Sequence, residues 1–64
     1  MNDAREERPK AEALLDKLLN NEHVSRWDMH KQRSQIIYLT QNVERYREVE
    51  DEALLLIDLA DESL

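Results

Sequence analysis

Apolar residues in the first third of the chain follow the i, i+3, i+4, i+7 spacing of one helix face. They are Ala11, Leu14, Leu15, Leu18 and Leu19. Pro9 precedes them, and proline is tolerated in the first turn of a helix but disfavours helix at the residue before it. We therefore predict a helix that starts at Pro9, after a frayed polar segment over residues 1–8. It should end near Asn20 and Asn21, because Asn readily takes the left-handed conformation of a C-terminal cap.

A second helix start is marked at Ser25. Its hydroxyl can act as an N-cap, and Asp28 three residues later forms a capping-box-like pair with it, with Asp in place of Glu. Val24 before the cap and Met29 four residues into the helix are spaced to form a hydrophobic staple. These signals predict that a new helix begins directly after Ser25.

From Met29 onward the apolar positions follow a heptad. Residues seven apart are Met29, Ile36, Val43, Glu50, Ile57 and Leu64, and their companions three residues later are Gln32, Leu39, Tyr46, Ala53 and Ala60. Since no Pro or Gly interrupts this stretch, the simplest hypothesis is one helix of up to about 40 residues. The alternative is a break near Glu48 to Asp51, where Glu50 interrupts the apolar seam and Asp51 could cap a third helix.

The composition favours helices throughout. The chain has 64 residues, no Gly, no Cys and a single Pro. Tight turns, β-hairpins and phosphate-binding loops mostly need Gly at positive φ, so we expect neither an all-β nor a Rossmann-type fold. We predict an all-α fold, either a helical hairpin or a three-helix bundle, with a short first helix packed on a long second helix. Residues 9–64 would form the single helical domain.

The C-terminal segment is unusually apolar. Seven of the eight residues over 53–60 are apolar, and Asp58 is the exception. A helix that is apolar on all sides must be buried on all sides, and the short first helix is too small to do that. Asp58, Asp61 and Glu62 also oppose the dipole of a helix C-terminus. We therefore expect a partner to cover this end, or the chain to continue past Leu64 as part of a longer protein.

Charge is unevenly placed along the chain, whose net charge is −6. All nine Lys and Arg precede Glu48, whereas seven of the fifteen Asp and Glu lie from Glu48 onward. Nucleic-acid phosphates and anionic lipids repel such a segment, so we expect no direct DNA or RNA binding. There is no long apolar run and no signal-peptide pattern, so we expect no membrane segment, and the absence of Cys fits the cytoplasm. A basic protein surface is one natural partner, and a solvated acidic face is the alternative.

No residue pattern predicts catalysis, a cofactor or a metal. Ser34 lies one helical turn after His30, without an oxyanion-binding loop or an orienting carboxylate. His23 and His30 share a face only if the helix runs through the loop, which the capping signals oppose. Glu48 and Glu52 are one turn apart, and on an exposed helix this is mild like-charge repulsion. We expect no enzyme activity, no catalytic residue and no bound cofactor or metal.

Four large apolar side chains outside the first helix lie either in the core or at a contact surface, and only Tyr46 has a single interpretation. Trp27, the only Trp, either plugs the end of the small core or anchors a partner, because Trp is enriched at binding hot spots. Tyr46 fits the seam and is predicted to be core. Ile37 and Tyr38 lie off the seam, so they either pack under the first helix or mark a second contact face.

The order of these features resembles the N-terminal helical domain of bacterial-type class I peptide chain release factors. The likeness is carried by Val24-Ser25-Arg26-Trp27-Asp28, by Val43-Glu44-Arg45-Tyr46-Arg47-Glu48 and by the Leu-rich acidic end from Leu54 to Glu62. It covers most of the chain from about Ala11 onward. In that family this domain contacts the ribosome near the stalk, while peptidyl-tRNA hydrolysis and stop-codon recognition reside in other domains.

The resemblance implies a non-catalytic docking module of a translation-termination factor, in contact with the ribosome or a ribosomal stalk protein and with the rest of the factor. The residues that we predict to bind the partner are Trp27, Leu54, Leu55, Leu56, Asp58, Leu59, Asp61 and Glu62. The alternative hypothesis is a self-associating helical adaptor or regulator, which would dimerise through the heptad seam or bind another helical protein.

Overall fold

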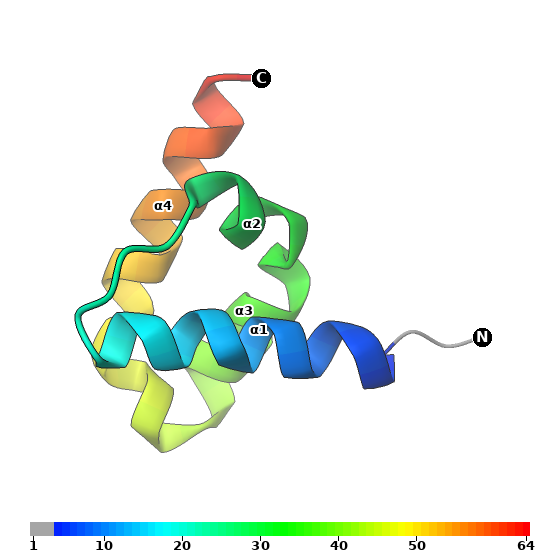
Figure 1. Ribbon diagram of the computed structural model, residues 1–64, viewed down its shortest axis with the longest axis vertical. Coiled ribbons are helices and arrows are strands. Elements are labelled where there is room, and N and C mark those ends of the chain that lie inside the picture. Colours follow the sequence, from blue (N-terminus) through cyan, green and yellow to red (C-terminus); the bar gives the residue numbers. More distant parts are fainter. Residues whose placement is uncertain (1–3) are drawn as a thin grey trace.

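The computed structural model describes residues 4–64, with side chains from residue 8 onward. It contains four α-helices and one 3-10 helix, and no strand is found in this part of the chain (Figure 1). They are α1 (Ala4–Leu19), α2 (Arg26–Lys31), α3 (Arg33–Asn42), η1 (Glu44–Val49) and α4 (Glu50–Glu62). The predicted all-α class is confirmed.

Helix α1 begins earlier than the sequence indicated. It starts at Ala4 and carries Pro9 inside it, so the predicted start at Pro9 was wrong. Pro9 is the sixth helical residue, where a missing N–H removes only one hydrogen bond close to the helix start. The frayed segment expected over residues 1–8 therefore overlaps α1 from Ala4, and residues 1–3 lie outside the described part.

The predicted end of α1 is confirmed. Asn21 adopts a left-handed φ of 60°. Its N–H donates to the Leu18 carbonyl at 3.0 Å, and the Glu22 N–H donates to the Lys17 carbonyl at 2.8 Å. This is the hydrogen-bond pair of a Schellman cap, which satisfies carbonyls that the helix leaves free. Asn here does the work usually given to Gly.

The start of α2 is also as predicted, with one difference in the cap. Ser25 is the N-cap, and its Oγ accepts from the Trp27 N–H at 3.2 Å. Among the described residues no hydrogen bond joins the Asp28 side chain to the Ser25 amide, so the capping box is half formed. Val24 and Met29 are both buried, at 7% and 0% exposure, and join the core as a staple would place them.

The prediction of a single long second helix was wrong. The chain bends at Gln32 and again at Val43, whose φ and ψ of −110° and 115° are extended. The alternative break near Glu48 to Asp51 is present, since α4 begins at Glu50, but its N-cap is Val49 rather than Asp51. As a result no helix after α1 is longer than 13 residues.

Side chains at the end of α3 explain the bend at Val43. The Thr40 hydroxyl donates to the Ile36 carbonyl at 2.8 Å, and the Asn42 side-chain amide donates to the Tyr38 carbonyl at 2.9 Å. Such local bonds compete with the next helical turn and end or bend a helix. The chain therefore turns back toward α1 instead of running on.

The folded-back helices enclose one core. α1 packs across α3 and η1, and the short α2 packs on the upper half of α4 (Figure 1). Most of the predicted seam lies inside this core rather than on a surface, and Tyr46 is confirmed as core at 1% exposure. The buried apolar residues are Ala11, Leu15, Leu18, Val24, Met29, Ile36, Leu39, Tyr46, Val49, Ala53, Ile57 and Ala60.

Helix α4 is covered by its own chain on one face only, so the chain does not bury this apolar segment on all sides. Ala53, Ile57 and Ala60 are buried, and small residues at two of these positions let neighbouring helices approach closely. Leu55 and Leu59 remain 56% and 37% exposed. None of the helices over residues 4–64 combines the length and apolarity needed to cross a bilayer.

Candidate functional site

A shallow apolar hollow of about 310 Å³ lies where the loop before α2 meets the C-terminal half of α4. Its walls are formed by His23, Val24, Ser25, Arg26, Trp27, Leu56 and Leu59. The Asn21 cap ends α1, and the Ser25 cap then starts α2, so local hydrogen bonds fix both ends of the loop between them. Val24 at the base is buried, whereas the surrounding side chains reach solvent.

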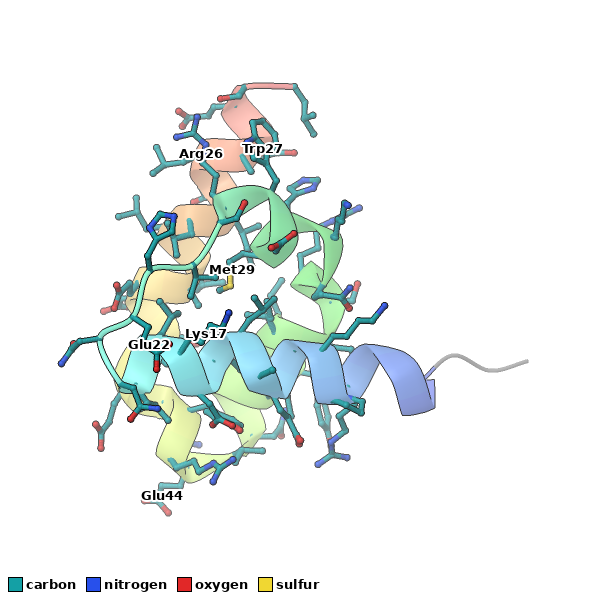
Figure 2. All side chains as sticks on the ribbon, viewed as in Figure 1. Lys17, Glu22, Arg26, Trp27, Met29 and Glu44 are labelled. Atoms are coloured by element: carbon teal, nitrogen blue, oxygen red, sulfur yellow. The ribbon has the colours of Figure 1, made fainter. Side chains whose placement is uncertain are left out.

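Trp27 forms the outer wall of the hollow. It is 41% exposed and lies at the same end of the molecule as the last turns of α4 (Figure 2). The Arg26 guanidinium carbon lies 5.4 Å from the centre of the Trp27 ring, a cation–π distance. Trp27 is absent from the buried core, whose nearest member on this wall is Val24. Its position favours a partner anchor over a core plug.

The other wall is a stripe of leucines on α4. Leu56 and Leu59 line the hollow, and Leu55, which lies one helical turn before Leu59, extends the apolar surface away from it. At 3.6 residues per turn, Asp58 and Glu62 follow on the outer side of Leu55. Both carboxylates are exposed. The apolar surface is thus bordered by negative charge on the α4 side and by Arg26 on the α2 side.

The structure brings together only part of the predicted partner-binding set. Trp27, Leu56 and Leu59 meet in the hollow, and Leu55 adjoins it. Leu54 is half-buried and packs against the core on another side of α4. Asp61 is directed to α2, where its Oδ1 lies 3.3 Å from His30 Nε2.

Four residues of the hollow were missed by the sequence argument, namely His23, Val24, Ser25 and Arg26. They come from the segment that was interpreted as a helix cap and as part of the family resemblance, and not as a contact surface. The one sequence feature that could have pointed to them is their position directly before Trp27. Their meeting with Leu56 and Leu59 depends on how α2 packs on α4, which no local pattern reports.

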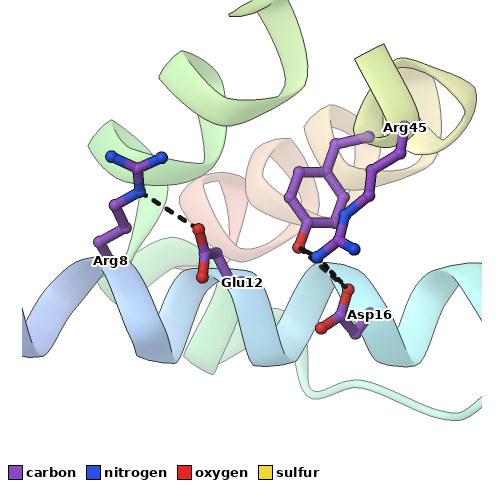
Figure 3. A network of polar contacts seen from close by, with 5 residues as sticks. Arg8, Glu12, Asp16 and Arg45 are labelled. Atoms are coloured by element: carbon purple, nitrogen blue, oxygen red, sulfur yellow. Dashed lines mark hydrogen bonds and ion pairs between the residues drawn. The ribbon is translucent and has the colours of Figure 1, made fainter. Parts of the chain in front are cut away.

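Away from the hollow, a cluster of polar side chains joins η1 to α1 (Figure 3). The Tyr46 hydroxyl donates to Asp16 Oδ1 at 3.0 Å, and Arg45 Nη2 donates to the same oxygen at 3.3 Å and also to the Tyr46 hydroxyl. The Arg45 guanidinium carbon lies 4.6 Å from the Tyr46 ring centre. On the same helix an exposed ion pair joins Arg8 to Glu12 at 3.2 Å.

The environment of this junction shifts two pKa values. Burial raises the pKa of Tyr46 above its usual 10, the hydrogen bond from Arg45 lowers it, and the bond to Asp16 raises it again. The hydrogen bond with Tyr46 is the main cause that raises the pKa of Arg45. Both shifts move the loss of a proton from Tyr46 or Arg45 further above neutral pH, so the junction acts as a fixed structural contact.

A second hollow of about 330 Å³ lies between α1 and α2. It is lined by Lys10, Ala13, Leu14, Asp28, Lys31 and Gln32. Lys10, Lys31 and Asp28 are all exposed at its rim. The polar share of its lining is larger than that of the first hollow, and no aromatic side chain lines it.

A His30–Ser34 pair for catalysis and a histidine pair for a metal were considered in the sequence analysis. The His30 ring lies 3.3 Å from Asp61 and 3.4 Å from an Arg33 nitrogen, while Ser34 is exposed on the first turn of α3. Within residues 4–64 no group of three or more His, Cys, Asp or Glu is placed to hold a metal ion.

The hollow beside Trp27 is therefore the strongest candidate site, and its chemistry is that of an apolar contact with charged borders. Comparison with family models, with curated proteins and with solved structures found no match to this chain.

Proposed function

We propose that this chain is a non-catalytic docking module that binds a partner protein through the hollow beside Trp27 and the leucine stripe of α4. The observation that carries the proposal is that Trp27, Leu55 and Leu59 are exposed in or beside one hollow, whereas the other exposed large apolar residues, Ile37, Tyr38 and Leu64, line neither hollow. Exposed apolar surface with a polar rim is typical of protein interaction sites. A partner that covers it removes this surface from water.

We further propose peptide chain release as the process that this module serves. The support is the resemblance of Val24 to Asp28 and of Leu54 to Glu62 to release factors, since these two segments supply both walls of the hollow. The ribosome or its stalk protein is then the partner outside the factor. The acidic residues of α4 suit a basic ribosomal protein.

The alternative of a dimer through the heptad seam has less support. Met29, Ile36, Leu39 and Ile57 of that seam are buried in the core of one chain, so they are not free to contact a second copy. A dimer through α4 would instead place two acidic helices side by side, since Glu50–Glu62 contains no Lys or Arg. Self-association therefore needs a different surface.

The test is co-sedimentation of the purified chain with purified ribosomes, with the double variant Leu55→Ser/Leu59→Ser as the disrupting change. We expect the wild type to bind and the variant to bind at least about tenfold more weakly, because two exposed leucines supply much of the apolar contact. Binding of the isolated stalk protein is measured in parallel.

The chain offers a closely matched control. Ile37 and Tyr38 on α3 are 36% and 53% exposed, against 37% and 56% for Leu59 and Leu55. The variant Ile37→Ser/Tyr38→Ser should bind as the wild type does. Equal loss in both variants would contradict the proposed surface, and wild-type chain that binds neither ribosomes nor stalk protein would contradict the proposed process.

A further inference from the structure

We propose that the occupant of the hollow is a single amphipathic helix of the partner, with one basic flank. This inference rests on the proposed docking function and names the chemistry of its partner. The apolar face of that helix covers Trp27, Leu56 and Leu59, and its Lys and Arg residues lie against the carboxylates of α4. Three features of the site support this choice.

The size of the apolar surface fits one helix. Leu55, Leu56 and Leu59 lie within little more than one turn of α4, and Trp27 stands beside them as a fourth apolar contact. A helix bound in a groove presents neighbouring anchors at i and at i+3 or i+4, which lie about 6 Å apart along its axis. One turn of leucines with a neighbouring Trp matches two such anchors. A folded domain would require a larger contact, of about 800 Å² on each partner.

The charges around the surface give the occupant its polarity. Helix α4 has six acidic residues and no basic residue. Asp51, Asp58 and Glu62 lie on its outer side, next to Leu55, and all three are exposed. Basic residues on the facing flank of a bound helix would pair with them, and steering by such charges speeds association. A flank of acidic residues would be repelled.

The opposite border carries the only cation of the hollow lining. Arg26 lies there over the Trp27 ring, and His23 is its neighbour in the lining. The flank of the bound helix on this side should therefore be neutral or acidic. The occupant is thus basic on one flank only, which also fixes the direction in which it runs along α4, because reversing that direction would exchange its two flanks.

The α4 helix of a second copy does not meet these requirements. Its flanks are acidic, so pairing two such helices sets Asp58 and Glu62 against like charges. Pairing of α4 with α4 is therefore disfavoured at neutral pH. A foreign helix that contributes the missing basic residues removes the repulsion.

The inference can be tested with synthetic peptides, because Trp27 is the only Trp and reports on the hollow directly. The probe is a helical Leu/Lys peptide of four turns with Lys on one flank. Its comparators are the same design with Glu in place of Lys, and a scrambled Leu/Lys peptide that has no apolar face. Fluorescence of Trp27 is followed as each peptide is added to the full chain.

We expect the Leu/Lys peptide to shift Trp27 emission to the blue and to bind at least about tenfold more tightly than the Leu/Glu peptide. The preference should shrink as salt is raised, since exposed charges are screened within about 10 Å at 0.1 M salt. Equal binding of the two peptides, equal binding of the scrambled peptide, or unchanged Trp27 emission would each overturn the inference.

Charge variants locate the effect on α4. Asp58→Asn/Glu62→Gln should reduce the preference for the Lys peptide several-fold. Glu44→Gln/Glu48→Gln removes the same charge from η1, and Figure 2 shows Glu44 at the opposite end of the molecule from Trp27. This control should leave the preference for the Lys peptide unchanged. An equal loss of preference in both variants would show that the preference comes from the net charge of the chain and not from α4, and would contradict the inference.

The outcome separates this inference from the proposed function. If Leu55→Ser/Leu59→Ser abolishes ribosome binding but no Leu/Lys peptide binds, the docking surface stands and its occupant is not a basic helix. If the peptide binds at Trp27 and ribosomes do not, the occupant stands and the proposed process falls. Failure of both removes the docking function altogether.

Discussion

Two Arg–aromatic pairs occupy opposite ends of this small domain and differ in what completes them. Arg45 lies over Tyr46, and Arg26 lies over Trp27, at 4.6 and 5.4 Å from the ring centres. Tyr46 is 1% exposed and Trp27 is 41% exposed. The two pairs share a sequence pattern, Arg followed by an aromatic residue. Only the Arg45–Tyr46 pair is closed, in the sense that other residues of the chain cover its ring and bond to it.

The difference comes from a third group. Asp16 of α1 accepts hydrogen bonds from both the Tyr46 hydroxyl and Arg45, so the polar groups of that pair have their partners within the chain. At the other end no carboxylate in the described residues is bonded to Arg26, and Leu56 and Leu59 leave the ring of Trp27 half open. A closed pair holds the fold together, and an open one is available to a partner.

The largest expected effect is on the closed pair. Tyr46→Ala should lower the free energy of unfolding by about 3–5 kcal/mol, as for other aromatic truncations in a core. That is comparable to the whole stability expected for a domain of this size. We therefore expect loss of the cooperative urea transition followed by far-UV circular dichroism. Tyr38→Ala, at the exposed tyrosine, is the control, and a normal transition in the Tyr46 variant would break the comparison.

The open pair should respond less in stability. Trp27→Ala removes a side chain that is only partly buried, so we expect a loss of about 1–2 kcal/mol in the free energy of unfolding. The same variant should lose the binding of the Leu/Lys peptide, measured by calorimetry because the fluorescent residue is gone. A loss of stability as large as that of Tyr46→Ala would make Trp27 a core residue and would remove the contrast.

The smallest change sharpens the role of the Tyr46 hydroxyl. Tyr46→Phe keeps the ring and removes the bonds to Asp16 and Arg45, so we expect it to cost about 1 kcal/mol at neutral pH. The measurement is urea unfolding of both proteins across a pH series. An unchanged free energy of unfolding at neutral pH would show that the hydroxyl adds nothing beyond the ring.

The pH series has a defined sign. The pKa of Tyr46 is raised in the folded chain, so above pH 10 the unfolded state loses its proton first. The folded state then binds more protons, and stability falls as pH rises toward the folded pKa. The advantage of wild type over Tyr46→Phe should be complete below pH 10 and shrink above it.

Local signals in the sequence predicted the ends of helices where one residue decides the geometry. Asn21 and Ser25 are examples, because a left-handed cap and a side-chain acceptor act within one turn. Most residues of the heptad are buried as well, although Leu64 is 80% exposed. The heptad could not show whether the helix is straight, since burial of Ile36 and Ile57 is compatible with one helix or with several that fold back.

The two unpredicted bends have weak sequence signals. Neither Gln32 nor Val43 is a helix breaker, although Thr40, Asn42 and Val43 form a run of low helix propensity. The partner-binding set was only partly assembled for a related reason. Which side of α4 faces Trp27 depends on the packing of α2, a tertiary contact that spacing along one helix does not contain. The proposed function remains a prediction from these residues.

The connections between distant segments have a consequence for how the chain folds. Asp16 meets Tyr46 across 30 residues, and His30 meets Asp61 across 31 residues. His30 lies in the sequence between Asp16 and Tyr46, whereas Asp61 lies beyond Tyr46, so the two stretches of chain that these contacts close overlap in sequence. Neither half of the chain then contains a complete set of its own contacts. We expect the slowest amide protons of α1 and α4 to exchange together, through global opening of one indivisible cooperative unit.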